Sequence, residues 1–193
     1  MLQILGLFGG IIALLGYIPY TRDILQHKVK PHRSTFFIWL VLGLIAVFSQ
    51  LAKGATNSLW LPSLETFGGL VIFILSLKYG IGGFGKRDFV ALLIALLGLI
   101  AWYFTREAAI ALYLVIFVDA VGGYLTLHKT YLHPETETSI AWILSAIGGV
   151  FTLLSVGSTN VILLSYPIFL IISNIAVVAT IQMGYQNKRK NSN

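Results

Sequence analysis

Seven apolar stretches, each about as long as a helix that crosses the hydrocarbon core of a bilayer, follow one another along this chain of 193 residues. The chain is 57% hydrophobic and only 10% charged, and its mean hydropathy is +0.86, values that are not typical of a soluble domain. We therefore expect an all-α membrane protein with seven transmembrane helices and short connections. The predicted spans are residues 2–20, 34–54, 57–77, 88–105, 107–127, 138–158 and 160–184.

The basic residues are unevenly distributed between the two predicted sides of the membrane. If the N-terminus lies outside, eleven Lys and Arg fall on the inner side and only Lys53 and Arg106 on the outer side. Inner loops carry such an excess, so we expect a cell (inner) membrane protein with its C-terminus in the cytoplasm. The net charge of +6 then follows from topology, with lipid as a partner and no nucleic acid. The inner residues are Arg22, Lys28, Lys30, Arg33, Lys78, Lys86, Arg87, Lys129, Lys188, Arg189 and Lys190.

An internal repeat is the second organising feature of the chain. The phrase PHRSTFFIW at 31–39 returns as PETETSIAW at 134–142, with Pro, Thr and Trp at the same spacing. One explanation of the repeat is chance identity in an apolar sequence. We favour the other explanation, in which the chain contains two repeated three-helix bundles. Because one span lies between them, both bundles keep the same orientation, and a binding site is expected between them near the midplane. The predicted units are a first bundle (1–80), a linker helix (81–106), a second bundle (107–184) and a basic cytoplasmic tail (185–193). Within the tail, the segment NKRKNSN (187–193) is expected to be a disordered anchor that faces anionic lipid.

The repeated phrase is typical of a helix start at an inner loop. Proline is tolerated there, the following Ser and Thr can cap free N–H groups, and Glu135 and Glu137 favour the positive end of a helix dipole. Trp39 and Trp142 then lie one turn deeper. They are interpreted either as interfacial anchors or as a facing pair that narrows the inner gate of a pathway. The expected capping residue is Ser34 or Thr35 in the first phrase and Thr136 or Thr138 in the second.

Three polar residues lie where lipid should exclude them. Glu65 is about 12 Å inside its span, while Asp119 and Asn174 are near the midplane. Ionisable groups at such depth indicate function, and no intramembrane Lys or Arg is available to neutralise these acids. We predict that Glu65, Asp119 and Asn174 bind the substrate and that an acid can relay a proton. Structural hydrogen bonds between helices are the competing interpretation.

Proline and glycine residues near or inside spans predict hinges. Pro19 is expected to end the first helix at the inner face, and Pro62 and Pro167 each free a backbone carbonyl inside a span. Gly122 and Gly123 are expected to soften the fifth helix. The same residues also occur in passive membrane helices, so both interpretations stay open.

No catalytic or cofactor motif stands out. GIGGFG, residues 80–85, matches G-x-G-x-x-G but joins two membrane helices, so it is interpreted as a flexible linker. His27 and His32 repeat the spacing of His128 and His133, yet the pairs are out of register in the repeat, so no metal site is expected. The chain has no cysteine. We expect no cofactor and no enzymatic activity.

Two segments of the chain resemble the PQ-loop and SWEET (MtN3/saliva) transporter clan, most closely bacterial seven-helix integral membrane proteins of that clan. They are GYIPYTRDILQHKVKPHRSTFFIW and DAVGGYLTLHKTYLHPETET. One departure is Tyr20 after Pro19, where the clan motif has Gln. The resemblance implies a 3+1+3 helix arrangement and alternating access between two bundles. It also implies a substrate role for Asn174, with Glu65 at the roughly corresponding position of the first bundle.

These observations predict a transporter of a small polar solute, sugar-like or another small metabolite, with possible proton coupling. The alternative is a receptor or accessory protein of the same fold that binds a ligand without transport. A homo-oligomer is possible.

Overall fold

The computed structural model describes residues 2–52, 60–83, 85–105, 108–157, 159 and 161–191. Within these residues the chain forms seven α-helices and no β-strand, which confirms the all-helical prediction. The helices follow the seven apolar stretches, and several extend beyond the predicted spans. They are α1 (Leu2–Leu25), α2 (Arg33–Ala52), α3 (Trp60–Tyr79), α4 (Lys86–Thr105), α5 (Ala108–Leu132) and, after the short 3₁₀ helix η2 (Pro134–Thr136), α6 (Ser139–Ser155) and α7 (Val161–Asn191).

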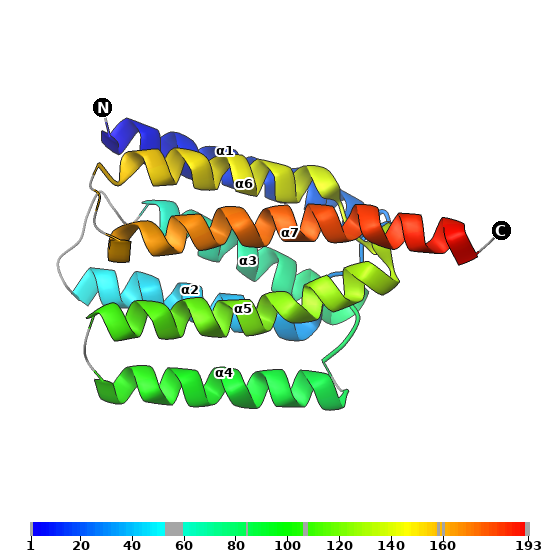
Figure 1. Ribbon diagram of the computed structural model, residues 1–193, viewed down its shortest axis with the longest axis horizontal. Coiled ribbons are helices and arrows are strands. Elements are labelled where there is room, and N and C mark those ends of the chain that lie inside the picture. The colour runs from blue at the N-terminus through cyan, green and yellow to red at the C-terminus, as the bar shows by residue number, and fades with distance from the viewer. Residues whose placement is uncertain are drawn as a thin grey trace.

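The helices run back and forth along one common direction (Figure 1). α1, α3, α5 and α7 finish at the end where α2, α4 and α6 begin. Most of the Lys and Arg residues of the chain fall at this end, which we call the basic end. The N-terminus lies at the opposite end, and the C-terminus of α7 projects from the basic end (Figure 1).

Helix packing follows the same pattern in the first triplet, α1–α3, and the second triplet, α5–α7. In the first, α3 packs against both α1 and α2; in the second, α7 packs against both α5 and α6. The triplets meet where α1 packs on α6 and where α2 packs on α5. These two contacts are equivalent if α1 corresponds to α5 and α2 to α6. α4 lies at the edge of the bundle and packs mainly on α5 (Figure 1).

The α1–α6 contact is close because small residues line it. A Cβ atom added to Gly9 would lie 2.8 Å from the carbonyl oxygen of Gly148, and one added to Gly16 would lie 2.9 Å from that of Ala141. Helices approach this closely where glycine removes the side chain, an arrangement that is common between membrane helices. The two triplets are therefore held backbone to backbone along this line.

Gly9→Ala should lower the melting temperature of the purified protein. The new methyl group meets a backbone oxygen that has no side-chain freedom to move, and overpacking of this kind costs about 1–3 kcal/mol. The matched control is Gly123→Ala, because a Cβ at Gly123 has no atom within 4 Å. Equal melting temperatures for the two variants would contradict this close packing.

Two helix ends differ from the sequence prediction. Pro19 does not end the first helix, since α1 continues through it to Leu25. Proline removes only one backbone hydrogen bond here, and the burial of Tyr20 and Ile24 stabilises the last turn. The disorder expected from residue 187 onward is also wrong up to Asn191, because α7 is helical to that residue, and residues 192–193 lie outside the described residues. The last turn of α7 carries three basic residues, which are favourable at the negative end of the helix dipole.

Two helices in the described part of the chain are clearly long and apolar enough to cross a membrane. They are α1 and residues Leu164–Lys190 of α7. Shorter apolar helical segments occur at Arg33–Leu44 and Ser139–Ser155.

Candidate functional site

Four polar side chains from four different helices come together inside the bundle. Tyr17 of α1, Glu65 of α3, Asp119 of α5 and Tyr166 of α7 are close enough to interact electrostatically, and we call them the polar cluster. Asp119 is only 8% exposed, and the hydroxyl of Tyr17 donates to the backbone carbonyl of Glu65 over 3.5 Å. Each triplet supplies one acid and one tyrosine, so the polar cluster lies between the two triplets.

The structure thus brings together two of the three residues predicted to bind substrate, Glu65 and Asp119. Asn174 is also buried, but its side-chain nitrogen donates to the carbonyl oxygen of Leu170 in the same helix over 2.8 Å. This bond uses one N–H group of the amide within α7 and does not link it to the two acids. The roles of all three residues in binding stay predictions.

Every helix of the polar cluster carries a proline or glycine close to its cluster residue. Pro19 follows Tyr17 by two positions, Pro167 follows Tyr166 directly, and Gly122 and Gly123 follow Asp119 after two intervening residues. All of these predicted hinges lie inside α-helices. Pro62 precedes Glu65 by three positions in the first turn of α3, where only the backbone is described.

Four aromatic rings separate the polar cluster from the basic end. The rings of Trp39 and Trp142 lie 6.0 Å apart with an interplanar angle of 65°. Tyr20 packs edge-on against Trp142 at 6.1 Å, and Phe36 packs against Trp39 at 5.3 Å. We call these four residues the aromatic layer. The repeat-matched tryptophans therefore contact each other across the two triplets, while their role as a gate stays a prediction.

Trp39 also borders the polar cluster. Its indole nitrogen is buried and has no hydrogen-bond partner among the described residues. The Asp119 carboxyl lies near this nitrogen. A polar group that approaches Asp119 would therefore also meet an unused donor.

A buried ionic network closes the basic end. The Glu137 carboxylate accepts hydrogen bonds from the Tyr20 hydroxyl over 3.1 Å and from the Trp142 indole over 2.9 Å. It also pairs with Lys129, whose ammonium group donates to the carbonyl of Lys30 over 2.8 Å. The Lys129 and Glu137 side chains are 3% and 0% exposed. This inner network, Tyr20, Lys30, Lys129, Glu137 and Trp142, joins α1 and the loop after it to α5 and α6.

The second repeat phrase makes contacts that the sequence did not predict. Glu137 was expected to favour the positive end of a helix dipole, and its carboxylate is in addition buried among three donors. Thr138 occupies the N-cap position of α6 without a side-chain cap bond. Its hydroxyl instead donates to Asp23 over 2.6 Å, because a charged acceptor on α1 forms the stronger hydrogen bond.

The first repeat phrase also makes contacts that capping does not describe. The Ser34 hydroxyl donates to Asp88 over 3.0 Å, and the Thr35 hydroxyl donates to the carbonyl of Gly122 over 2.7 Å. These bonds tie the start of α2 to α4 and α5. In the second phrase, the Thr136 hydroxyl donates to the carbonyl of His133 over 2.7 Å within the loop. Both phrases therefore serve mainly to fasten the basic end together.

The glycine-rich segment after α3 is docked and is not a free linker. Its Ile81 exchanges backbone hydrogen bonds of 3.0 Å with Pro31 and Arg33. Gly82 has φ +76°, and a Cβ there would lie 2.4 Å from the ring of His32. Only glycine fits this position without strain. The segment holds α3 and α4 against the loop between α1 and α2.

His32 is buried beside Asp88 in this docked region. Its Nε2 atom lies 3.2 Å from Asp88 Oδ1, whereas Nδ1 is buried without a hydrogen-bond partner among the described residues. A second ring proton would therefore be an unsatisfied buried donor. Burial lowers the pKa of His32 to about 4, against the opposing effect of Asp88. The folded protein keeps this imidazole neutral.

Mild acid should destabilise the protein through His32. The unfolded chain protonates this histidine below its ordinary pKa of about 6.5, while the folded state takes up the proton only near pH 4. The contribution of His32 to the free energy of unfolding is therefore complete above pH 6.5 and falls as the pH drops from about 6.5 to about 4. Melting temperatures at pH 7 and pH 5 should differ less in His32→Gln than in the wild type. His133→Gln is the control, because the His133 side chain is 56% exposed. An unchanged pH dependence in His32→Gln would contradict the account.

No family model, no curated protein and no solved structure matches this chain.

Proposed function

We propose that this protein is a membrane transporter that moves a small polar solute by alternating access between its two helix triplets. The observation that carries the proposal is the polar cluster, to which each triplet contributes one acid and one tyrosine. A relative movement of the triplets changes the distances within such a site. It therefore couples binding to opening.

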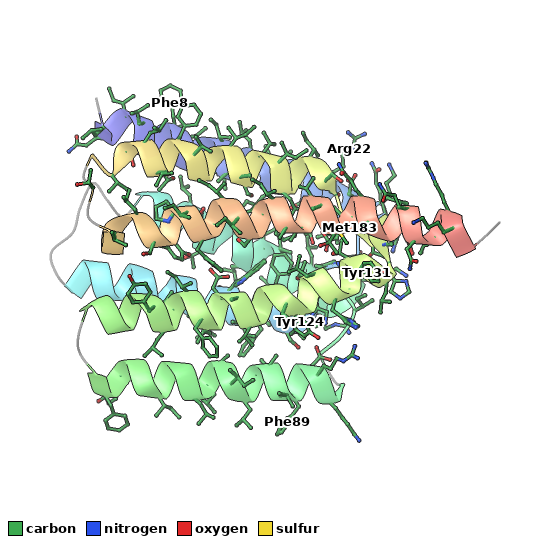
Figure 2. All side chains as sticks on the ribbon, in the orientation of Figure 1. Phe8, Arg22, Phe89, Tyr124, Tyr131 and Met183 are labelled. Atoms are coloured by element: carbon green, nitrogen blue, oxygen red, sulfur yellow. The ribbon has the colours of Figure 1, made fainter. Side chains whose placement is uncertain are left out.

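The outer surface of the bundle supports a membrane location. Large apolar side chains project outward from several helices, as Figure 2 shows for Phe8 and Phe89. Several are more than 60% exposed, whereas soluble proteins rarely expose apolar patches of this extent. We propose that all seven helices span the bilayer, with the basic end in the cytoplasm. Examples that are more than 60% exposed are Ile18, Phe67, Phe89, Tyr103, Phe104, Val161 and Ile172.

The two triplets are proposed to act as parallel three-helix bundles with α4 as the linker helix. The matched packing of α3 and α7 within their triplets supports this, as do the repeated phrases. Together with the sequence resemblance, this arrangement supports membership of the PQ-loop and SWEET clan. The predicted hinges beside the polar cluster are the points at which the helices would bend.

The pathway is closed at the basic end. Trp39 and Trp142 are proposed to form the inner gate, with the inner network behind it. Opening this side requires the tryptophans to separate and the hydrogen bonds from Tyr20 to Glu137 and from Lys129 to Lys30 to break. The present conformation is therefore the inward-closed state of the proposed cycle.

The chemistry of the polar cluster favours a solute rich in hydrogen-bond donors. The two carboxyl groups and two phenol groups of the polar cluster offer mostly hydrogen-bond acceptors. Hydroxyl or amino groups on the solute would match them. Glu65 and Asp119 are also the proposed carriers of a coupled proton.

Ligand binding to the polar cluster can be tested by thermal stability. We expect one class in a panel of sugars, amino acids, nucleosides and vitamins, tested at pH 5.5 and 7.5, to raise the melting temperature. A ligand at one hundred times its Kd stabilises by about 2.7 kcal/mol. The shift should vanish in Asp119→Asn and Glu65→Gln but remain in Glu135→Gln, an acid that is 49% exposed at the basic end. Equal loss in all three variants would contradict the assigned site.

A receptor that binds the same solute without transport is the second candidate. The inner network favours it, because two hydrogen bonds that join the triplets, from Tyr20 to Glu137 and from Lys129 to Lys30, must break before the basic end can open. A receptor would show the same thermal shift and no flux across a membrane.

A further inference from the structure

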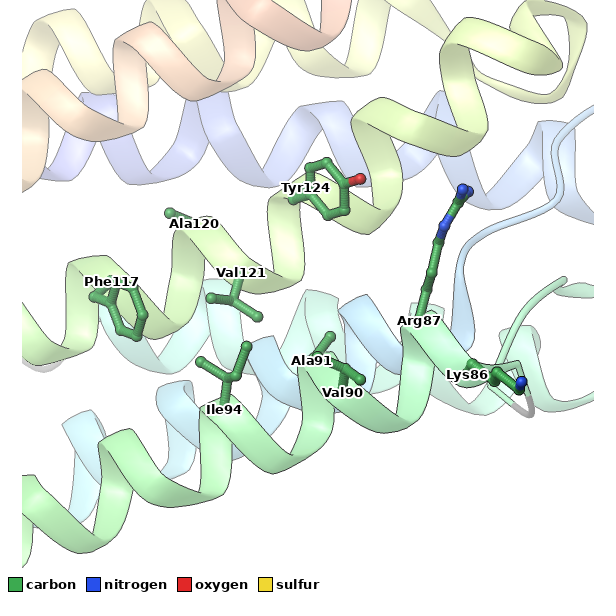
Figure 3. Close-up of a pocket in the computed structure, with 9 residues that line it drawn as sticks. All are labelled: Lys86, Arg87, Val90, Ala91, Ile94, Phe117, Ala120, Val121 and Tyr124. Atoms are coloured by element: carbon green, nitrogen blue, oxygen red, sulfur yellow. The ribbon is translucent and has the colours of Figure 1, made fainter.

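A groove runs along the outside of the bundle between α4 and α5, with a volume of about 440 Å³ (Figure 3). Apolar side chains such as Ile94, Phe117 and Val121 line most of it. Figure 3 shows Lys86 and Arg87 together at one end, where α4 begins. The groove therefore has a long apolar part and a cationic head at the basic end.

Several side chains along the groove are exposed at the outside of the bundle. Val90 and Phe117 are each 51% exposed, and Tyr124 is 55% exposed. Lys86 forms no ion pair among the described residues. Arg87 contacts the ring of His128 on α5, which holds its guanidinium group across the head of the groove. Both cations are available to an anion from outside.

The dimensions of the groove fit one leaflet of a bilayer. From Lys86 to Ile94 the helix rises by about 12 Å, close to half of a hydrocarbon core about 30 Å thick. We propose that this groove binds an anionic phospholipid of the inner leaflet, with its phosphate at Lys86 and Arg87 and an acyl chain on the apolar floor. Basic pockets between membrane helices on the cytoplasmic side bind such headgroups. The inference rests on the membrane orientation in the proposed function and is independent of transport.

A second groove of the bundle provides a comparison. It lies between α1 and α3, has a volume of about 660 Å³ and is also mostly apolar. Only one cation, Arg22, lines it. Both grooves are thus apolar, but the groove between α4 and α5 carries two cations and the other carries one. We therefore expect the groove between α4 and α5 to be the more selective for an anionic lipid, although its volume is smaller.

Native mass spectrometry of the full-length protein in neutral detergent tests the proposal. Phosphatidylglycerol and phosphatidylcholine with the same acyl chains are added separately, and the lipid that remains bound is counted. We expect the wild type to retain one phosphatidylglycerol at concentrations where phosphatidylcholine is lost. Lys86→Gln/Arg87→Gln should bind phosphatidylglycerol roughly tenfold to thirtyfold more weakly, because it loses two cations near the headgroup.

Two further variants separate charge at the groove from other effects. Lys28→Gln/Lys190→Gln removes the same charge from exposed positions at the basic end and should keep the preference. Ala120→Trp fills the groove from an exposed position and should abolish retention without lowering the melting temperature. Equal retention of both lipids, equal losses in the two double variants, or displacement by glycerol phosphate alone would overturn the proposal. Liposome flux is measured separately, so lipid retention without flux would count against transport and not against this site.

Discussion

Lys129→Met should lower the free energy of unfolding by about 3–5 kcal/mol, the largest stability loss that we expect from a single side chain. The substitution leaves the Glu137 carboxylate with no counter-charge at a position where its side chain is 0% exposed. The remaining donors, Tyr20 and Trp142, are neutral and cannot replace the ammonium group. Chemical or thermal unfolding in detergent would measure the effect.

A second ion pair at the basic end provides the matched control. Lys188 and Glu135 lie 2.6 Å apart, and their side chains are 47% and 49% exposed. Lys188→Met should therefore cost only about 0–1 kcal/mol, because water screens an exposed pair. The double variant Lys129→Met/Glu137→Gln should recover part of the loss of Lys129→Met. Similar costs for the two single lysine variants would show that the inner network is not a buried ionic structure.

Cross-linking α1 to α6 at the basic end should lower the rate of solute uptake at least about tenfold while leaving solute binding intact. Asp23 and Thr138 form a 2.6 Å side-chain hydrogen bond between these helices. The chain has no cysteine, so a Cys pair at these two positions would be the only thiols present. A short thiol-specific cross-linker that can be cleaved by reduction would hold the basic end closed.

The control for this experiment is each single Cys variant treated with the same reagent. We expect normal uptake in both, and recovery of uptake in the double variant after reduction. Unchanged uptake by the fully cross-linked protein would show that α1 and α6 do not separate at the basic end during transport.

The helices could be predicted well because their cause is local. A run of about twenty apolar residues specifies a membrane-length helix without reference to any other part of the chain. The predicted end of α1 was wrong because its cause is not local. Pro19 alone favours termination, and only the burial of Tyr20 and Ile24 against other helices shows why the helix continues.

The candidate site was predictable only in part. Glu65 and Asp119 stand out because charge is rare in apolar runs, whereas Tyr17 and Tyr166 do not. A sequence signal for these tyrosines was present, since each closely precedes a proline inside its helix. The ion pair between Lys129 and Glu137 had no such signal in the sequence. Lys129 was already counted among the basic residues of the inner side, and Glu137 was assigned to the positive end of a helix dipole. Contacts between residues of a loop and of separate helices depend on packing, which the local pattern does not contain.

Transport is tested most directly with liposomes that contain the purified protein, by measuring uptake of the solute that thermal shift identifies. We expect saturable uptake by the wild type, loss of uptake in Asp119→Asn, and uptake close to the wild-type rate in Glu135→Gln. Binding of the solute with no uptake above that of protein-free liposomes would contradict transport and favour the receptor.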